Sequence, residues 1–255
     1  MFSTRSKSMT AFGLILMWGM IVWGGEARAF ILETNPTKVR INDSDEGKSF
    51  QIGWFLGAGQ SDNDGGNTSL IDLSATGLFT ISSYSDSAIT INVLMANTTV
   101  LSSPVTEAGI TSFGLGVDPD ATVAFSDNND GGFTGAQINS TGNFPGGFKN
   151  IDICAFTAGC NGGGQSSALA VGAVDQFSLT FTPTSTSFAD GFMLAFFPIK
   201  FQTTNLDQDQ FPGKGGSFEF AGTPVPEPAT ALLSGLGLLG MVGYLHFRRK
   251  KEILR

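Results

Sequence analysis

Apolar and polar residues alternate along several stretches of this chain, and this pattern predicts β-strands. The clearest stretches are residues 50–56, 89–95 and 177–182, where bulky apolar side chains occur at every second position. Successive side chains of a strand point to opposite faces, so a period of two is typical of strands with one buried face. The alternation is shorter or weaker in segments 38–41, 78–81, 110–117, 121–125, 148–156 and 217–221, which we also expect to be strands.

One segment, residues 192–201, is almost wholly apolar rather than alternating. A continuous apolar run predicts a strand that is buried on both faces. Pro198 lies inside this run and has no N–H to donate to a neighbouring strand. We therefore expect a β-bulge or a sheet edge near Pro198.

Clusters of Asp, Asn, Gly and Ser separate these segments, and such residues favour turns. The clusters occupy residues 61–67, 127–132, 139–147 and 161–167. Strands at this spacing predict an all-β fold, and we expect an antiparallel β-sandwich, jelly-roll-like or Ig-like, over residues 30–204. Residues 205–224 are rich in Gln, Asp, Gly and Pro, and we expect a stalk or linker there.

The N-terminal segment has the features of a secretory signal peptide. Arg5 and Lys7 precede an apolar stretch over residues 11–23, and Ala27 and Ala29 form an A-x-A cleavage site before Phe30. This order predicts a signal peptide over residues 1–29 that signal peptidase removes. A first transmembrane helix is the alternative, but thirteen apolar residues are fewer than a membrane span needs.

The C-terminal segment combines a proline-rich break, an apolar stretch and a basic cluster. Residues 231–247 contain no Asp, Glu, Lys or Arg, which predicts a short transmembrane helix. The basic cluster after it would stay on the cytoplasmic side. The residues that define the two ends of this segment are Val225, Pro226, Glu227, Pro228, Arg248, Arg249, Lys250 and Lys251.

This order of features resembles the PEP-CTERM sorting signal of Gram-negative bacteria, here over residues 225–255. The resemblance implies recognition by a membrane-embedded exosortase, transient anchoring by the C-terminal helix, cleavage near Pro226 to Pro228, and delivery to the cell surface or the extracellular matrix. An ordinary single-pass anchor without cleavage is the alternative interpretation.

The charge of the segment between the two ends limits the class of partner. Residues 30–230 contain six Lys and Arg against twenty Asp and Glu, a formal charge of −14. Such an acidic surface argues against binding nucleic acid or anionic lipid head groups.

The single histidine, His246, lies in the C-terminal segment that sorting would remove. A mature domain without His lacks the base of a Ser-His-Asp site and the usual zinc ligands. We therefore predict no catalytic residues and a non-enzymatic protein of the extracellular matrix or exopolysaccharide layer. A carbohydrate-binding module is an alternative, although only Trp54 and Tyr84 remain as candidate aromatic platforms for sugar rings. A polysaccharide hydrolase that uses two carboxylates is a further alternative.

Cys154 and Cys160 are the only cysteines. In an exported chain such a pair predicts a disulfide that closes a small loop. A redox site would require the spacing C-x-x-C, and a zinc site would require further ligands.

Residues 61–67 contain Asp62 and Asp64 followed by glycine, an arrangement with which calcium loops begin. A looser version occupies residues 127–132. Neither has the glutamate that completes an EF-hand loop, and β-turns explain both segments more simply. We predict no cofactor and keep calcium at Asp62 and Asp64 as the alternative.

Overall fold

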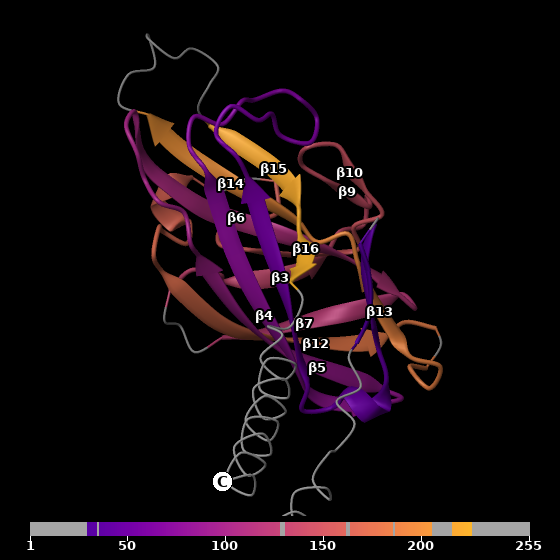
Figure 1. The fold of residues 1–255 in the computed structure, drawn as a ribbon. Coiled ribbons are helices and arrows are strands. Elements are labelled where there is room, and N and C mark those ends of the chain that lie inside the picture. The colour runs from indigo at the N-terminus through magenta and orange to yellow at the C-terminus, as the bar shows by residue number, and fades with distance from the viewer. Residues whose placement is uncertain are drawn as a thin grey trace, which may run out of the picture. The chain divides into compact units, whose positions relative to one another are not determined.

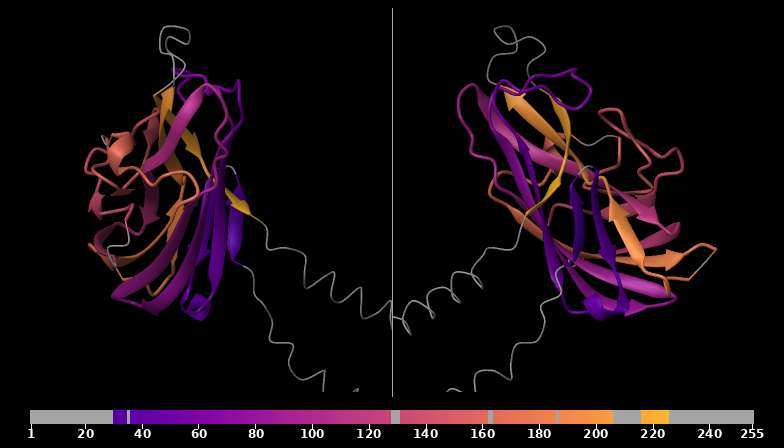
Figure 2. Two further views of the ribbon diagram at one scale, coloured as in Figure 1. Left: turned by 90° about the vertical axis from the view of Figure 1, so that its left-hand side faces the viewer. Right: turned by 45° about the vertical axis from the view of Figure 1, so that its right-hand side comes forward.

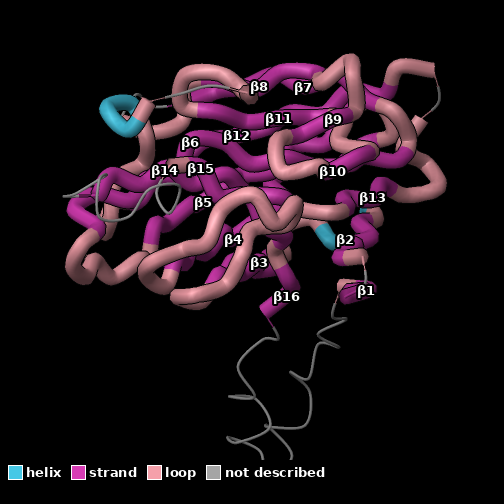
Figure 3. Tube along the Cα trace, turned by 90° about the horizontal axis from the view of Figure 1, so that it is seen from above, coloured by secondary structure: helices cyan, strands magenta, loops and turns pink. Residues whose placement is uncertain are grey.

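The computed structural model describes residues 30–34, 36–127, 131–161, 164–185, 187–205 and 216–225. These residues form an all-β fold of antiparallel sheets, and two short 3-10 turns, η1 (Asp43–Asp45) and η2 (Gln165–Ser167), are its only helical elements within the described ranges (Figure 3). The fold below is that of the unit that begins at Ile31.

One sheet has six strands. Their spatial order is β16 (Thr223–Val225), β3 (Ser49–Leu56), β4 (Leu73–Ser85), β5 (Ala88–Asn97), β12 (Val174–Pro183) and β7 (Ala121–Asp127) (Figure 1).

The other sheet has eight strands. Six follow one path: β1 (Ile31–Thr34), β2 (Thr37–Ile41), β13 (Phe192–Ala195), β6 (Val105–Asp118), β11 (Ile153–Phe156) and β8 (Gly135–Ile138). The remaining two branch from it, because β14 (Pro198–Asn205) pairs with both β6 and β15 (Ser217–Ala221). A separate hairpin consists of β9 (Asn143–Phe144) and β10 (Phe148–Lys149). Early and late strands mix in both sheets, so segments far apart in the sequence lie side by side (Figure 2).

Phenylalanine rings from both sheets form a shared core. Phe79 of β4 lies 6.3 Å from Phe113 of β6 and 5.7 Å from Phe197, measured between ring centroids. Phe177 of β12 also contacts Phe113, at 6.1 Å. Most of these pairs have the edge-to-face or tilted geometry that aromatic rings prefer. The two sheets therefore pack against each other as in a β-sandwich.

In the six-stranded sheet, apolar and polar residues alternate along the strands, which gives one buried face and one solvent-exposed face. Along β5 the inward side chains of Ile89, Ile91, Val93 and Met95 are buried, whereas the residues between them are partly or fully exposed. The predictions over 50–56, 78–81, 89–95, 121–125 and 177–182 are confirmed as parts of β3, β4, β5, β7 and β12.

In the eight-stranded sheet, β6 is buried on both faces through most of its length. Phe113 and Leu115 point toward the other sheet, and the positions between and after them are Gly114 and Gly116. A Cβ on Gly114 would lie 2.5 Å from the Cγ2 atom of Ile151, so only glycine lets the covering layer approach this closely.

The apolar run over residues 192–201 contains the predicted irregularity. Phe196 and Phe197 have φ values of 72° and 50°, and they separate β13 from β14. Pro198 begins β14, a position where the missing N–H costs no ladder bond. Both strands pair with β6, and the run is buried at most of its positions, as its apolar composition predicted.

The stalk predicted over residues 205–224 is wrong for residues 217–224. They form β15 and the start of β16, joined by Gly222, and Phe218 and Phe220 are buried. Polar composition suggested a linker, but the two phenylalanines alternate with polar residues and pack into the fold. Residues 206–215 lie outside the described ranges.

Candidate functional site

The last strand of the described residues is β16, which lies beside β3 at one edge of the six-stranded sheet (Figure 1). Thr223 pairs with Gly53, and Val225 pairs with Gln51. The next residue is Pro226, the first proline of the C-terminal motif. The proline-rich break of the C-terminal segment therefore follows the last paired residue in the sequence.

Buried hydrogen bonds fix the backbone at Gly222, the residue between β15 and β16. The Trp54 indole Nε1–H donates to the Phe197 carbonyl at 2.7 Å, and the Gly222 N–H donates to the same carbonyl at 2.9 Å. The Thr37 hydroxyl donates to the Gly222 carbonyl at 2.7 Å. A Cβ on Gly222 would lie 2.6 Å from the Trp54 Nε1 atom, so a larger residue would displace the strand.

A family comparison identifies the segment that begins within β16 and continues past the described residues. Residues 224–250 match the PEP-CTERM protein-sorting motif. This chain carries a PEP-CTERM sorting signal. The motif supports export, processing by an exosortase and delivery to the cell surface or the extracellular space. No curated protein and no solved structure matches the chain.

Most residues of the two terminal signals lie outside the described ranges. This holds for Ala27, Ala29, Pro226, Glu227, Pro228 and the basic cluster 248–251, whereas Phe30 and Val225 are described. The predicted helix over 231–247 also lies outside them. Within the described ranges, no helix has the length and apolar character that a membrane crossing needs.

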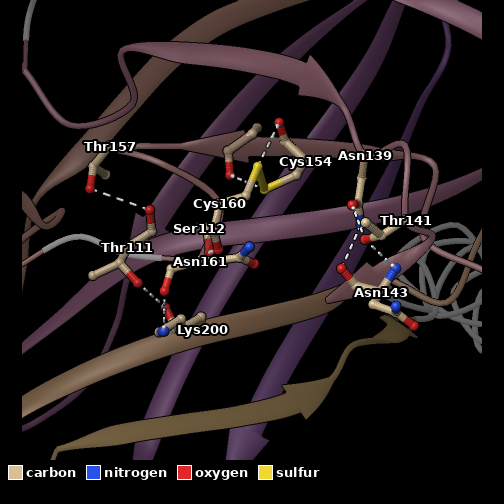
Figure 4. Close-up of a disulfide and its surroundings, with 11 residues drawn as sticks. Thr111, Ser112, Asn139, Thr141, Asn143, Cys154, Thr157, Cys160, Asn161 and Lys200 are labelled. Carbon is tan, nitrogen blue, oxygen red and sulfur yellow. Dashed lines mark hydrogen bonds between the residues drawn. A yellow bond between two sulfur atoms is a disulfide. The ribbon is translucent and has the colours of Figure 1, made fainter. Parts of the chain in front are cut away.

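The predicted disulfide between Cys154 and Cys160 is present (Figure 4). Cys154 belongs to β11, and the two Cα atoms are 5.9 Å apart. Both cysteines are buried in a small cluster with Phe144 and Ile151, which covers the outer side of β6. The bond therefore lies inside this cluster and links β11 to the loop that follows it.

Asp62 and Asp64 stabilise a turn in the loop between β3 and β4. The Asp62 carboxylate is buried and accepts hydrogen bonds from the backbone N–H and side-chain amide of Asn67, at 3.1 and 3.2 Å. The Asp64 carboxylate accepts from the Gly66 N–H at 3.0 Å. This geometry matches the turn interpretation of residues 61–67. In the described part of the chain, no three His, Cys, Asp or Glu side chains gather as a metal site would require.

A buried ion pair, which the sequence pattern did not reveal, lies between β14 and β15. Lys200 and Glu219 are direct partners across these strands, and their charged atoms are 3.7 Å apart. The Ser217 hydroxyl donates to the same Glu219 oxygen at 2.6 Å, and the Lys200 ammonium donates to the Asn161 carbonyl at 3.4 Å. Burial raises the pKa of Glu219, while Ser217 and Lys200 act against this shift.

The loop that contains Asp62 and Asp64 is fixed next to this pair. The Asn63 N–H donates to the Glu219 carbonyl at 2.8 Å, and the Asn63 side-chain amide donates to the Gly146 carbonyl at 2.7 Å. Loop, hairpin and β15 therefore form one connected structure. The sequence contained one signal for this pair, which is the single Lys in the apolar run 192–201. A Lys is rarely buried without a partner, so a Lys in a buried strand implies an acidic residue beside it.

A cleft of about 320 Å³ lies at the ends of β2, β6 and β13. Its lining includes one cation and two carboxylates, from Arg40, Asp118 and Asp190. The Arg40 guanidinium donates to the Asp190 carbonyl at 3.1 Å. Among the described residues, this is a cleft where the two carboxylates of a hydrolase would be sought.

Proposed function

We propose that this PEP-CTERM protein is a non-enzymatic structural or adhesive component of the extracellular matrix. In this proposal, signal peptidase removes residues 1–29 and the helix over 231–247 anchors the chain transiently. An exosortase then releases a sandwich domain of jelly-roll-like or Ig-like type. The sorting motif matched over residues 224–250, which begins within β16, carries the proposal.

Two features of the fold support a role outside the cytoplasm that depends on stability rather than chemistry. The Cys154–Cys160 disulfide suits an oxidising compartment. The buried charges of Lys200 and Glu219 are paired with each other, which favours a structural role for both.

Mass spectrometry of protein released from the cell surface tests the sorting step. We expect peptides from the domain and none C-terminal to Ala231. A released protein that retains Tyr244 would overturn processing at the motif. Glu227→Ala should retain the protein in the membrane fraction, and Glu107→Ala, at an exposed position on β6, should not.

Assays for released reducing sugars test the non-enzymatic part of the proposal. We expect no release from polysaccharides and a change in biofilm formation or flocculation after gene deletion. Sugar release that disappears in Asp118→Asn would establish the hydrolase alternative and place it in the cleft beside Arg40.

A further inference from the structure

The outer face of the six-stranded sheet, the face turned away from the core, carries a row of short polar side chains across five strands. Ser49, Thr80, Asn92, Ser178 and Ser126 are successive cross-strand partners on β3, β4, β5, β12 and β7. Neighbouring strands are about 4.8 Å apart, so this row extends over about 19 Å. Figure 1 labels the five strands.

No Asp, Glu, Lys or Arg lies on the outer face in the described strands. The two acidic residues in these strands, Asp175 and Asp127, share the inward side with Phe177. The described part of the outer face therefore carries no charged side chain, although residues 30–230 together have a formal charge of −14. The acidic residues of the domain are therefore concentrated elsewhere.

A neighbouring row adds an apolar centre to the outer face. Gln51, Leu78, Leu94 and Gln176 are successive cross-strand partners. Leu78 and Leu94 are 39% and 40% exposed although they lie in the middle of the sheet. A shallow depression of about 240 Å³ surrounds them, lined by Leu78, Thr80, Asn92, Val93, Leu94 and Gln176.

Hydrogen bonds between side chains hold this array in place. Ser49 and Thr80 are 2.7 Å apart, and the Ser178 hydroxyl donates to the Asn92 side-chain oxygen at 2.8 Å. Thr90 and Thr180 form a third pair at 3.0 Å. Because these short side chains are already ordered, a ligand that contacts them loses little conformational entropy on binding.

The chemistry of this face fits a neutral polysaccharide. Sugar rings present C–H groups that can cover Leu78 and Leu94, and hydroxyl groups that can exchange hydrogen bonds with Thr80, Asn92 and Gln176. An anionic polymer would be repelled by the net charge of the domain. A protein partner fits less well, because Ser and Thr are under-represented among the residues that contribute most to protein interfaces.

We propose that the outer face of the six-stranded sheet binds a neutral polysaccharide, with Leu78 and Leu94 as its apolar centre. Trp54 is buried and the Tyr84 hydroxyl donates a hydrogen bond to the Phe188 carbonyl, so neither expected aromatic platform serves this site. The aromatic side chain that the described strands place on this face is Phe55 of β3, which is 64% exposed. This inference rests on the proposed matrix function and names the partner through which the domain would be retained there.

Affinity electrophoresis of the full chain in mild detergent tests the site. The probes are hydroxyethyl cellulose and dextran as neutral polymers and alginate as an anionic one. We expect a neutral polymer to retard the protein and alginate not to. Leu94→Asp should weaken retardation about tenfold, because it places a charge against sugar C–H groups. Leu101→Asp is the matched control, since Leu101 is 38% exposed outside this face, and it should bind as the wild type does.

Gln176→Glu adds one charge to the outer face with almost no change of shape, and it should also weaken binding. This second variant tests the site even if Leu94→Asp does not fold. Binding that both variants retain would overturn the proposal, as would a protein that neither neutral polymer retards. A dimer that Leu94→Asp dissociates, without glycan binding, would identify the face as a contact between copies. If binding fails while mass spectrometry finds the tail removed, only this inference fails; an unprocessed tail contradicts the proposed function instead.

Discussion

The two sheets differ in how many of their faces are covered. The six-stranded sheet buries one face and leaves the other in water, so its strands alternate regularly. The eight-stranded sheet is covered on both sides along β6, and this second cover requires glycines, a disulfide cluster and a buried ion pair. Adding a layer to a sheet removes its alternation and concentrates the structurally sensitive residues there.

Truncation of the buried acid should have the largest effect on stability. Glu219→Ala leaves the Lys200 charge buried without its partner, and we expect a loss of about 3–5 kcal/mol in the free energy of unfolding. Gln176→Ala on the exposed face of the other sheet should change it by less than about 0.5 kcal/mol. Urea denaturation measures both, and equal losses would remove the distinction between the sheets. Glu107→Ala controls for loss of a negative charge at an exposed position.

Removal of the disulfide should have the next largest effect. The bond closes a short loop, so replacing Cys154 and Cys160 with alanine should lower the free energy of unfolding by about 2–3 kcal/mol. Adding a reductant should destabilise the wild type and leave the double variant unchanged. If reductant shifts neither protein in urea denaturation, the cover over β6 does not depend on the bond.

Glycine substitutions compare the two sheets directly. Gly114→Ala would force its new methyl group against Ile151 and should cost about 1–3 kcal/mol. Gly53→Ala on the outer face of β3 meets only the end of the Val225 side chain, at 3.0 Å, and should change stability by less than about 0.5 kcal/mol. Thermal denaturation of both variants gives the comparison, and a larger cost at Gly53 would contradict it.

The pH dependence of stability should show the smallest effect. Burial raises the pKa of Glu219 in the folded protein above its ordinary value of 4.5. Below that pH, Glu219 is protonated in both the folded and the unfolded protein, and its contribution to the free energy of unfolding is fully present. As the pH rises to the raised pKa, the unfolded chain releases its proton first, so this contribution is lost.

Lys200 and Ser217 favour the charged form of Glu219, and Asp62 and Asp64 oppose it. The stability of the wild type relative to Glu219→Gln should therefore fall as the pH rises through this window. Urea denaturation at a series of pH values measures the difference. A difference that stays constant with pH would show that the pKa of Glu219 is the same in both states.

The sequence predicted the six-stranded sheet better than the eight-stranded one, for a physical reason. A face in water selects polar residues at every second position, as between Ile89 and Met95, and this pattern is readable without a structure. In β6 the outward positions include Gly114 and Gly116, so an alternation of large and small residues replaces the alternation of apolar and polar ones. The prediction over 110–117 therefore covered only part of the strand Val105–Asp118.

Among the candidate sites, those defined by local spacing were predictable. The pair Cys154–Cys160 and the sorting motif are both read from neighbouring residues. The Lys200–Glu219 pair and the outer face depend on strand register. In the outer face, Thr80 and Asn92 come from adjacent strands, but Ser178 lies 86 residues beyond Asn92. No local pattern brings such residues together.

The indole of Trp54 also provides an optical reporter of the whole domain. The chain has three tryptophans, and Trp18 and Trp23 lie within the predicted signal peptide, so its removal leaves a single fluorophore. Its Nε1–H donates a hydrogen bond to the carbonyl of Phe197, between β13 and β14, and the ring packs against Gly222, just before the last described strand. A shift of its emission to longer wavelength would record when β16 leaves β3, and would do so without any label.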